Sequence, residues 1–141
     1  MERVKIRQPE KFIFKTEIAI QIADINYGGH LSNDAVLRLC HEARLRFLSH
    51  HGYSEQNVEG VGLIMSDAMI QFSNQAFYGE VLQISLAIDE IKKVGFDLIM
   101  LLAKKDSHQE VAIVKTGMVF FDYTKQKIAH TPDAFKNKFN A

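Results

Sequence analysis

The chain has 141 residues, 47% of them hydrophobic and 24% charged, so it can bury a sizeable core and is too apolar to be a disordered chain. The 17 basic and 17 acidic residues cancel, and the lack of a basic excess argues against a nucleic-acid-binding protein. Because the single cysteine excludes an internal disulfide, and no apolar segment has signal-peptide character or the length of a membrane span, we expect one cytoplasmic domain over residues 1–141.

The first half of the chain predicts one strand and one long helix. Apolar and polar residues alternate over Lys11–Ile22, as in a half-buried strand. A loop of polar and glycine residues follows at 24–30. Ser32–Asp34 are candidate caps of a helix that continues to about His50, and Gly52 is a stop signal. Apolar residues cover more than one stripe of this helix, which predicts that other structure wraps it.

The second half predicts four strands and a short terminal helix. Its segments are rich in Val, Ile, Phe and Met and are separated by short polar breaks, a pattern typical of hairpins in an antiparallel sheet. The proline after Thr131 suits the first turn of a helix that Thr131 caps. The predicted strands are Val61–Phe72, Glu80–Ile91, Val94–Ala103 and Glu110–Tyr123. One helix and five antiparallel strands predict a two-layer α+β domain whose sheet curls around the helix.

Polar and glycine residues gather between the first strand and the long helix. The segment reads Asp24-Ile-Asn26-Tyr-Gly28-Gly29-His30-Leu-Ser-Asn33. Free backbone N–H groups at a helix start make such loops frequent binding sites, and glycines let the backbone approach a ligand closely. The same residues also suit an ordinary turn in which Asp24 and Asn26 make local hydrogen bonds.

This loop, the following His41-Glu42-Ala43-Arg44 and the residues 70–82 resemble the hotdog-fold acyl-CoA thioesterase superfamily, in particular its 4-hydroxybenzoyl-CoA thioesterase-like branch. The order of the predicted elements is similar to that family from Lys11 to Tyr123. The resemblance implies a hotdog fold that hydrolyses a thioester between an acyl group and coenzyme A or a carrier protein. It implies no metal and no cofactor, because coenzyme A is part of the substrate. It also implies a homodimer or homotetramer with sites between protomers.

The resemblance assigns roles to three residues of the loop and helix start. The family's loop carboxylate falls on Asn26, which cannot be a nucleophile or base but can orient the water or the substrate carbonyl. The family's oxyanion donor, a backbone N–H at the helix start, falls near Asn33. His30 suits either general-base work or a positioning role. The expected substrate-binding residues are Asp24, Gly28, Gly29, Ser66 and Asp67.

Two adjacent helix residues are candidates for the base. Glu42 is the nearest acidic residue, whereas the family's helix carboxylate often falls on the position of His41. Adjacent helical side chains point about 100° apart, so the two cannot easily serve one site. Arg38 and Arg46 flank Glu42 at the spacing of helical ion pairs, which is the competing interpretation. If both assignments hold, Asn26→Ala and Glu42→Ala each lower turnover by about tenfold or more.

Two other functions stay open. Asp24-x-Asn26, and Gly29-His30 with Glu42, are similar to motifs of hotdog-fold hydratases and dehydratases that act on enoyl- or hydroxyacyl-thioesters, although Tyr27 replaces the hydratase proline. The amide of Asn26 in place of a carboxylate also fits a non-catalytic acyl-thioester-binding protein. Acyl specificity depends on the pocket and on the partner protomer.

Overall fold

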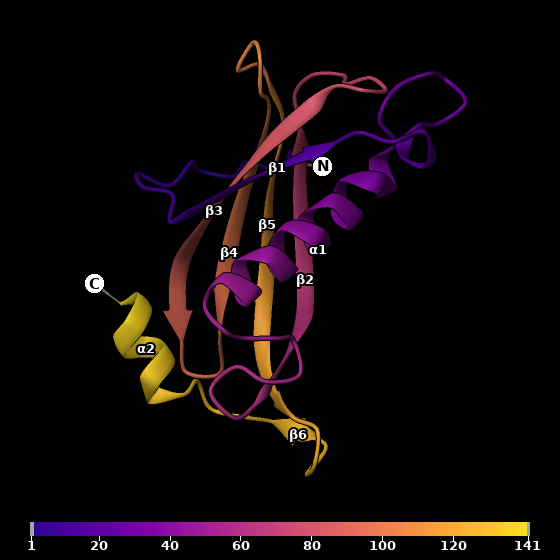
Figure 1. Cartoon of the computed structure of the whole chain (residues 1–141). Helices are drawn as coiled ribbons and strands as arrows, with labels where there is room; N and C mark the ends of the chain where they lie inside the picture. Colours follow the sequence, from indigo (N-terminus) through magenta and orange to yellow (C-terminus); the bar gives the residue numbers. More distant parts are fainter. Residues whose placement is uncertain (1, 141) are drawn as a thin grey trace.

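The computed structural model describes residues 2–140 and shows a long helix lying across one face of an antiparallel sheet (Figure 1). The elements are β1 (Phe14–Ala19), the short 3-10 helix η1 (Ile22–Asp24), α1 (Asn33–His50), β2 (Gly62–Phe72), β3 (Val81–Lys92), β4 (Gly95–Lys104), β5 (Glu110–Asp122), β6 (Lys127–Ile128) and α2 (Asp133–Phe139). The strand order is β1-β3-β4-β5-β2, with β6 paired to β5. The predicted α+β arrangement is confirmed, and the two-residue strand β6 is an addition to it.

The helix α1 has one buried and one exposed side. It begins at Asn33 and ends at His50, followed by Gly52 in the left-handed region (φ 76°), as the sequence predicts. The buried residues are Ala35, Val36, Leu39, Cys40, Ala43, Arg44, Phe47 and Leu48. Arg38, Glu42 and Leu45 are exposed, so in the single chain the sheet covers one side of the predicted central helix. Because the sheet forms a single layer, it covers only the apolar stripe of α1 that faces it.

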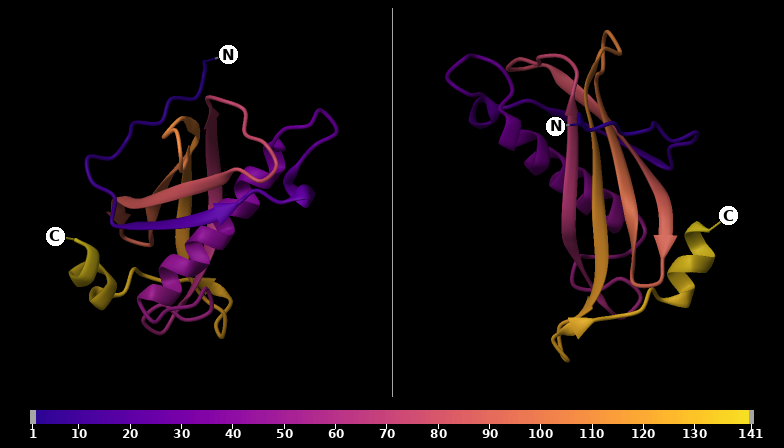
Figure 2. Two further views of the ribbon diagram at one scale, coloured as in Figure 1. Left: turned by 45° about the horizontal axis from the view of Figure 1, so that its top comes forward. Right: turned by 180° about the vertical axis from the view of Figure 1, so that it is seen from behind.

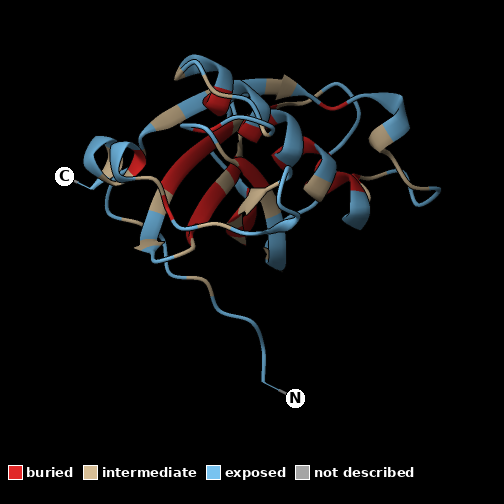
Figure 3. Cartoon of the chain, turned by 90° about the horizontal axis from the view of Figure 1, so that it is seen from below, coloured by how far each residue is buried: buried red, intermediate tan, exposed pale blue. Residues whose placement is uncertain are grey.

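The core lies between α1 and the middle strands, as the red ribbon of Figure 3 shows. Side chains of β4 alternate across the sheet, so Phe96, Leu98 and Met100 face α1 while Asp97 and Ile99 face the other side. The sheet therefore has an inner face toward α1 and an outer face.

The first strand is shorter than the sequence predicts. It spans Phe14–Ala19 instead of Lys11–Ile22, and Ile22 starts η1 with 71% of its surface exposed. The alternating pattern runs on past the strand, but the backbone N–H of Gln21 donates to Oδ2 of Asp24 at 2.9 Å. This local hydrogen bond competes with the sheet ladder and turns the chain out of the sheet.

The segment before β1 crosses the outer face of the sheet (Figure 2). The backbone N–H of Ile6 donates to Oε1 of Gln71 on β2 at 3.1 Å, and Nε2 of Gln8 donates to Oε1 of Glu110 at 2.6 Å. Gln71 points away from α1 because its neighbour Ile70 packs against the core. The segment therefore joins the β1 edge of the sheet to the β2 edge.

The terminal helix α2 closes the end of the core below the β3–β4 turn. Phe135 is buried, with its ring centroid 4.8 Å from that of Phe96 and 5.2 Å from that of Phe120. The capping residue is Pro132 and not Thr131, whose hydroxyl donates to the carbonyl of Lys92 at 2.6 Å. No helix within residues 2–140 is both long and apolar enough to cross a membrane.

Candidate active site

The loop before α1 is closed by hydrogen bonds between its two ends. The backbone N–H of Asn26 donates to the carbonyl of His30 at 3.0 Å, and the backbone N–H of His30 reaches Oδ1 of Asn26 at 3.4 Å. Gly29 has a φ of 87°, which favours glycine, and a Cβ on Gly28 would lie 3.2 Å from Oδ1 of Asn26. Local geometry thus accounts for both glycines, and the Asn26 side chain holds the backbone of His30.

Asp24 fastens this loop to the helix. Its Oδ1 lies 3.6 Å from Nη2 of Arg38, and its backbone carbonyl accepts from the N–H of Ser32 at 2.9 Å. The side chain is mostly buried, at 14% exposure. Within one chain Asp24 therefore orients the start of α1, and it is not among the residues that line the pocket at this helix start.

The start of α1 presents a free backbone donor. The N–H of Leu31 donates to the carbonyl of Ala76 at 2.8 Å, which ties this point to the β2–β3 connection. Ser32 is the N-cap, but its hydroxyl donates to the Asp34 carboxylate and lowers the pKa of that group. Among residues 2–140 we find no acceptor for the N–H of Asn33. A helix N-terminus carries a partial positive charge, so this donor suits an anionic oxygen.

A pocket of about 190 Å³ opens at this helix start. It is lined by His30, Asn33 and Val36 on one side and by the β2–β3 connection from Phe72 to Ala76 on the other. Nδ1 of His30 lies 3.3 Å from the carbonyl oxygen of Leu31. When Nδ1 donates in that bond, Nε2 becomes the acceptor nitrogen of the ring. The pocket therefore combines a candidate base with a candidate oxyanion donor.

A second pocket, of about 240 Å³, lies further along the same flank of α1. Its walls are Leu37, Arg38, Cys40, His41 and Arg44 from α1, Met65 from β2 and Thr116 from β5. At 100° per residue, Asn33, Leu37 and Cys40 point to the same side of the helix. We call the two pockets together the α1–β2 groove.

The two helix candidates for the base lie on different sides of α1, about 100° apart. Oε2 of Glu42 is 2.8 Å from Nε of Arg46, and Glu42 lines a shallow depression beside Phe14 of β1. His41 lines the α1–β2 groove, where its Nε2 lies 2.8 Å from Oε1 of Glu55. The structure therefore brings His30, Asn33 and His41 to one groove and separates Glu42 from them.

Glu55 also binds Arg44, whose side chain is only 9% exposed. Nε and Nη2 of Arg44 both lie 3.0 Å from Oε2 of Glu55. Burial acts to raise the pKa of Glu55, but the hydrogen bond from His41 and the charge of Arg44 outweigh it, and the pKa is lowered. The carboxylate is thus held ionised between the Arg44 guanidinium and the His41 ring.

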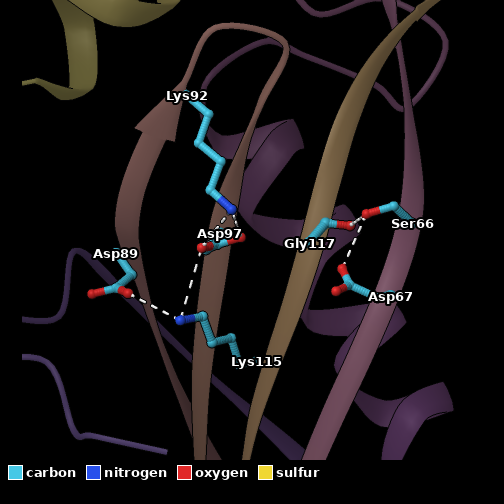
Figure 4. A network of polar contacts seen from close by, with 7 residues as sticks. All are labelled: Ser66, Asp67, Asp89, Lys92, Asp97, Lys115 and Gly117. Atoms are coloured by element: carbon cyan, nitrogen blue, oxygen red, sulfur yellow. Dashed lines mark hydrogen bonds and ion pairs between the residues drawn. The ribbon is translucent and has the colours of Figure 1, made fainter.

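Ser66 and Asp67 sit at a β-bulge in β2, on the outer face of the sheet (Figure 4). The hydroxyl of Ser66 lies 3.0 Å from Oδ1 of Asp67 and 3.1 Å from the carbonyl of Gly117. Gly117 faces outward because its neighbour Thr116 faces α1. Within one chain these two residues are therefore not part of the α1–β2 groove.

Cys40 is a core residue of the groove wall. It is 1% exposed, and burial raises its pKa to about 12, so the thiol stays neutral. Among residues 2–140, no three His, Cys, Asp or Glu side chains are placed to hold a metal ion. The groove offers histidine, backbone and hydroxyl groups for chemistry.

Sequence reasoning missed two residues of this region. Glu55 stands outside any motif, and only the adjacent His41 and Arg44 on one helix flank hint that an acidic partner must lie nearby. Thr116 looks like an ordinary strand residue, and only the three-dimensional structure shows its surroundings.

Comparison with known proteins connects this geometry to a family. The model of the thioesterase-like superfamily matches residues 20–139. No curated protein gives a significant match to the chain.

Solved structures share the fold over most of the chain. A 1,4-dihydroxy-2-naphthoyl-CoA thioesterase from Synechocystis is 25% identical, covers 90% of this chain and 95% of its own, and superposes with a TM-score of 0.80. A gentisyl-coenzyme A thioesterase is 18% identical, with 87% and 99% covered and a TM-score of 0.77. A Staphylococcus aureus protein solved in complex with CoA is 16% identical, with 99% and 86% covered and a TM-score of 0.80.

These matches confirm the hotdog fold that the loop and helix motifs suggested, and they support thioester hydrolysis as the class of activity. The family match covers far more than half of the chain, and it includes the loop, α1 and the whole sheet beyond β1. The chain therefore belongs to the thioesterase-like superfamily.

Proposed function

We propose that the protein hydrolyses acyl-CoA thioesters, with the thioester carbonyl at the start of α1 and the acyl group in the α1–β2 groove. The observation that carries this proposal is that one pocket is lined by both His30 and Asn33, and that the backbone N–H of Asn33 has no acceptor within residues 2–140. Thioester hydrolysis needs a group that activates water and a donor for the developing oxyanion.

The reaction follows from these two groups. Nε2 of His30 accepts a proton from water while the water oxygen attacks the acyl carbon. The carbonyl oxygen becomes an oxyanion, which accepts a hydrogen bond from the backbone N–H of Asn33 at the positive end of α1. The C–S bond then breaks, the carboxylic acid forms, and the thiolate of coenzyme A takes up the proton held by His30.

Asn26 acts as a positioning residue in this scheme. Its side chain and backbone bind the backbone of His30 at both ends of the loop, at 3.4 Å and 3.0 Å. An amide suits this role, because it offers a hydrogen bond without adding a negative charge beside the oxyanion. The substitution of the family's carboxylate thus moves the role of base to His30.

The comparisons support coenzyme A as the carrier of the acyl group. Two of the similar solved structures are named as CoA thioesterases, and a third was solved in complex with CoA.

We also propose that the protein assembles as a homodimer through β2, with homotetramers as a further level. The outer edge of β2 has no partner strand within residues 2–140. Met65 and Phe72 on that strand are 44% and 50% exposed, and both face the α1 side. A second copy paired along β2 would cover them and close the groove.

A thiol-release assay tests the activity. Wild-type protein is incubated with short, long and aromatic acyl-CoAs, and free thiol is measured against time. We expect release with at least one class, and a loss of about 100-fold or more in kcat for His30→Ala. Water addition to an enoyl-CoA without thiol release would instead indicate a hydratase, and tight binding without turnover would indicate a binding protein.

A further inference from the structure

Thr116 lines the second pocket, and its buried hydroxyl has no hydrogen-bond partner within residues 2–140. The residue is 2% exposed, and its Oγ1 is the one buried side-chain oxygen or nitrogen among residues 2–140 without a hydrogen-bond partner. Buried hydroxyls are nearly always hydrogen-bonded, because an unpaired one loses its hydrogen bonds to water and gains none in the protein, which costs free energy. An unpaired hydroxyl on a pocket-lining residue therefore indicates that its hydrogen-bond partner is an atom of the bound ligand.

The other polar groups of this pocket are already engaged or weak. Nε2 of His41 binds one oxygen of Glu55, and the Arg44 guanidinium binds the other. The Cys40 thiol is neutral and a weak donor. Among the polar side chains of this pocket, Thr116 is the one that is both buried and without a hydrogen-bond partner within residues 2–140, and its hydroxyl can either donate or accept.

The pocket has room for an acyl group. Its volume is about 240 Å³. An apolar cavity of about 150 Å³ is sufficient for benzene. Leu37, Cys40 and Met65 supply apolar walls around the hydroxyl.

The rises along α1 and along β5 each estimate how far the second pocket lies from the start of α1. Along α1, the rise from Asn33 to Cys40 is about 10 Å at 1.5 Å per residue. Along β5, the rise from Ala112, which pairs with Phe72 of the first pocket, to Thr116 is about 13 Å at 3.3 Å per residue. An extended acyl chain of eight carbons reaches about this far.

We propose that Thr116 is a specificity-determining residue that selects acyl groups with an oxygen near the far end of the chain. This inference rests on the proposed function, because it assumes that the thioester lies at the start of α1. A hydroxyl or carbonyl oxygen on the acyl group pairs with Thr116. A plain hydrocarbon chain of equal length gains no such hydrogen bond, so the site favours the oxygenated chain.

Matched substrates test the assignment. Octanoyl-CoA and omega-hydroxyoctanoyl-CoA differ only in the terminal oxygen. We expect wild-type kcat/KM to favour the hydroxylated substrate by about tenfold. Thr116→Val keeps the shape of the side chain and should bring the ratio to about one or below, mainly by lowering kcat/KM for the hydroxylated substrate, whose oxygen loses its partner. Thr116→Ser keeps the hydroxyl and should keep the preference.

A second buried threonine provides the control. Thr131→Val removes a hydroxyl that is already bonded to the carbonyl of Lys92, outside the groove, and should leave the substrate ratio unchanged. Equal wild-type rates for the two substrates, or a preference that survives in Thr116→Val, would overturn the assignment.

Failure of the proposed function gives a different result. If wild-type protein releases no thiol from either substrate, hydrolysis is refuted, and calorimetry with octanoic acid and omega-hydroxyoctanoic acid then tests the pocket alone. A preference for the hydroxy acid that Thr116→Val removes would still support the assignment. Equal binding of the two acids, or no binding, would overturn it.

Discussion

His41 and Glu55 are joined by a 2.8 Å contact between Nε2 and Oε1. Glu55 precedes β2 in the chain, so the contact connects the middle of α1 to the start of the edge strand. The other oxygen of Glu55 accepts from Arg44, which is buried at 7% exposure. Two members of the His41-Glu42-Ala43-Arg44 segment thus share one carboxylate, and Glu42 points to a different side of the helix.

Glu55→Gln should destabilise the protein strongly. The substitution keeps the size of the side chain but leaves the buried Arg44 cation without its counter-charge, which costs about 3 kcal/mol or more. Urea unfolding near neutral pH measures the change in the free energy of unfolding. Glu42→Gln is the control, because its ion pair with Arg46 is half exposed and contributes less than about 1 kcal/mol. Equal losses in the two variants would contradict this account of Glu55.

Turnover should separate His30 from Glu42. Removing the proposed base in His30→Ala lowers kcat by about 100-fold or more, whereas Glu42→Gln stays within about twofold of wild type, since Glu42 faces β1. Thiol-release kinetics on both variants, with circular dichroism to confirm folding, provide the measurement. A large loss in Glu42→Gln would restore the alternative in which the helix carboxylate is the base.

Acid should weaken the contact between the C-terminal ends of α1 and α2. Burial lowers the pKa of His51, and the nearby charges of Lys138 and His50 lower it further. The unfolded chain then binds a proton more readily than the native one. The stabilisation is complete above the unfolded value of about 6.5 and is lost as the pH falls through the native pKa.

The matching variant is His51→Phe. It keeps an aromatic ring against Phe47 and Phe139, whose centroids each lie 5.0 Å from that of His51, but cannot take up a proton. The free energy of unfolding, measured at about pH 7.5 and about pH 5.5, should fall less in this variant than in wild type. An identical fall in both proteins would remove His51 from the explanation.

The two buried threonines should respond oppositely to valine. Thr116→Val removes an unpaired hydroxyl and should raise the free energy of unfolding by about 1 kcal/mol. Thr131→Val breaks the bond to the carbonyl of Lys92 and should lower it by about 1 to 2 kcal/mol. Thermal melting of the ligand-free proteins is the measurement. A loss of stability in Thr116→Val would show that its hydroxyl already has a partner in solution.

Most of the fold was predictable because buried residues recur at regular intervals along each strand and along the helix. Leu98 and Met100 alternate with outward residues on β4, and the apolar positions of α1 recur at helical spacing, so strands and helix could be read directly. The alternation failed at Ile22, where a local hydrogen bond at Asp24 overrides it. The segment crossing the outer face was not predicted, because it is held by isolated polar contacts such as Ile6 with Gln71.

The site was predictable only where neighbours in sequence are neighbours in space. Asn26, His30 and Asn33 lie in one loop and helix start, and the structure brings them together. The position of Glu42 relative to the groove depends on which side of α1 the sheet covers. The sequence of the helix does not determine that side. The partner of His41 comes from a different segment, so no local pattern identifies Glu55.

The placement of the amino-terminal segment has a practical consequence for experiments. Ile6 is bonded to Gln71 on the edge strand β2, so a purification tag fused ahead of it would emerge beside the edge at which a second copy is expected to pair. A tag attached after α2 emerges on the β3 side of the molecule, away from β2 (Figure 1). Hydrodynamic measurements of the assembly are therefore best made with the tag at the carboxyl terminus.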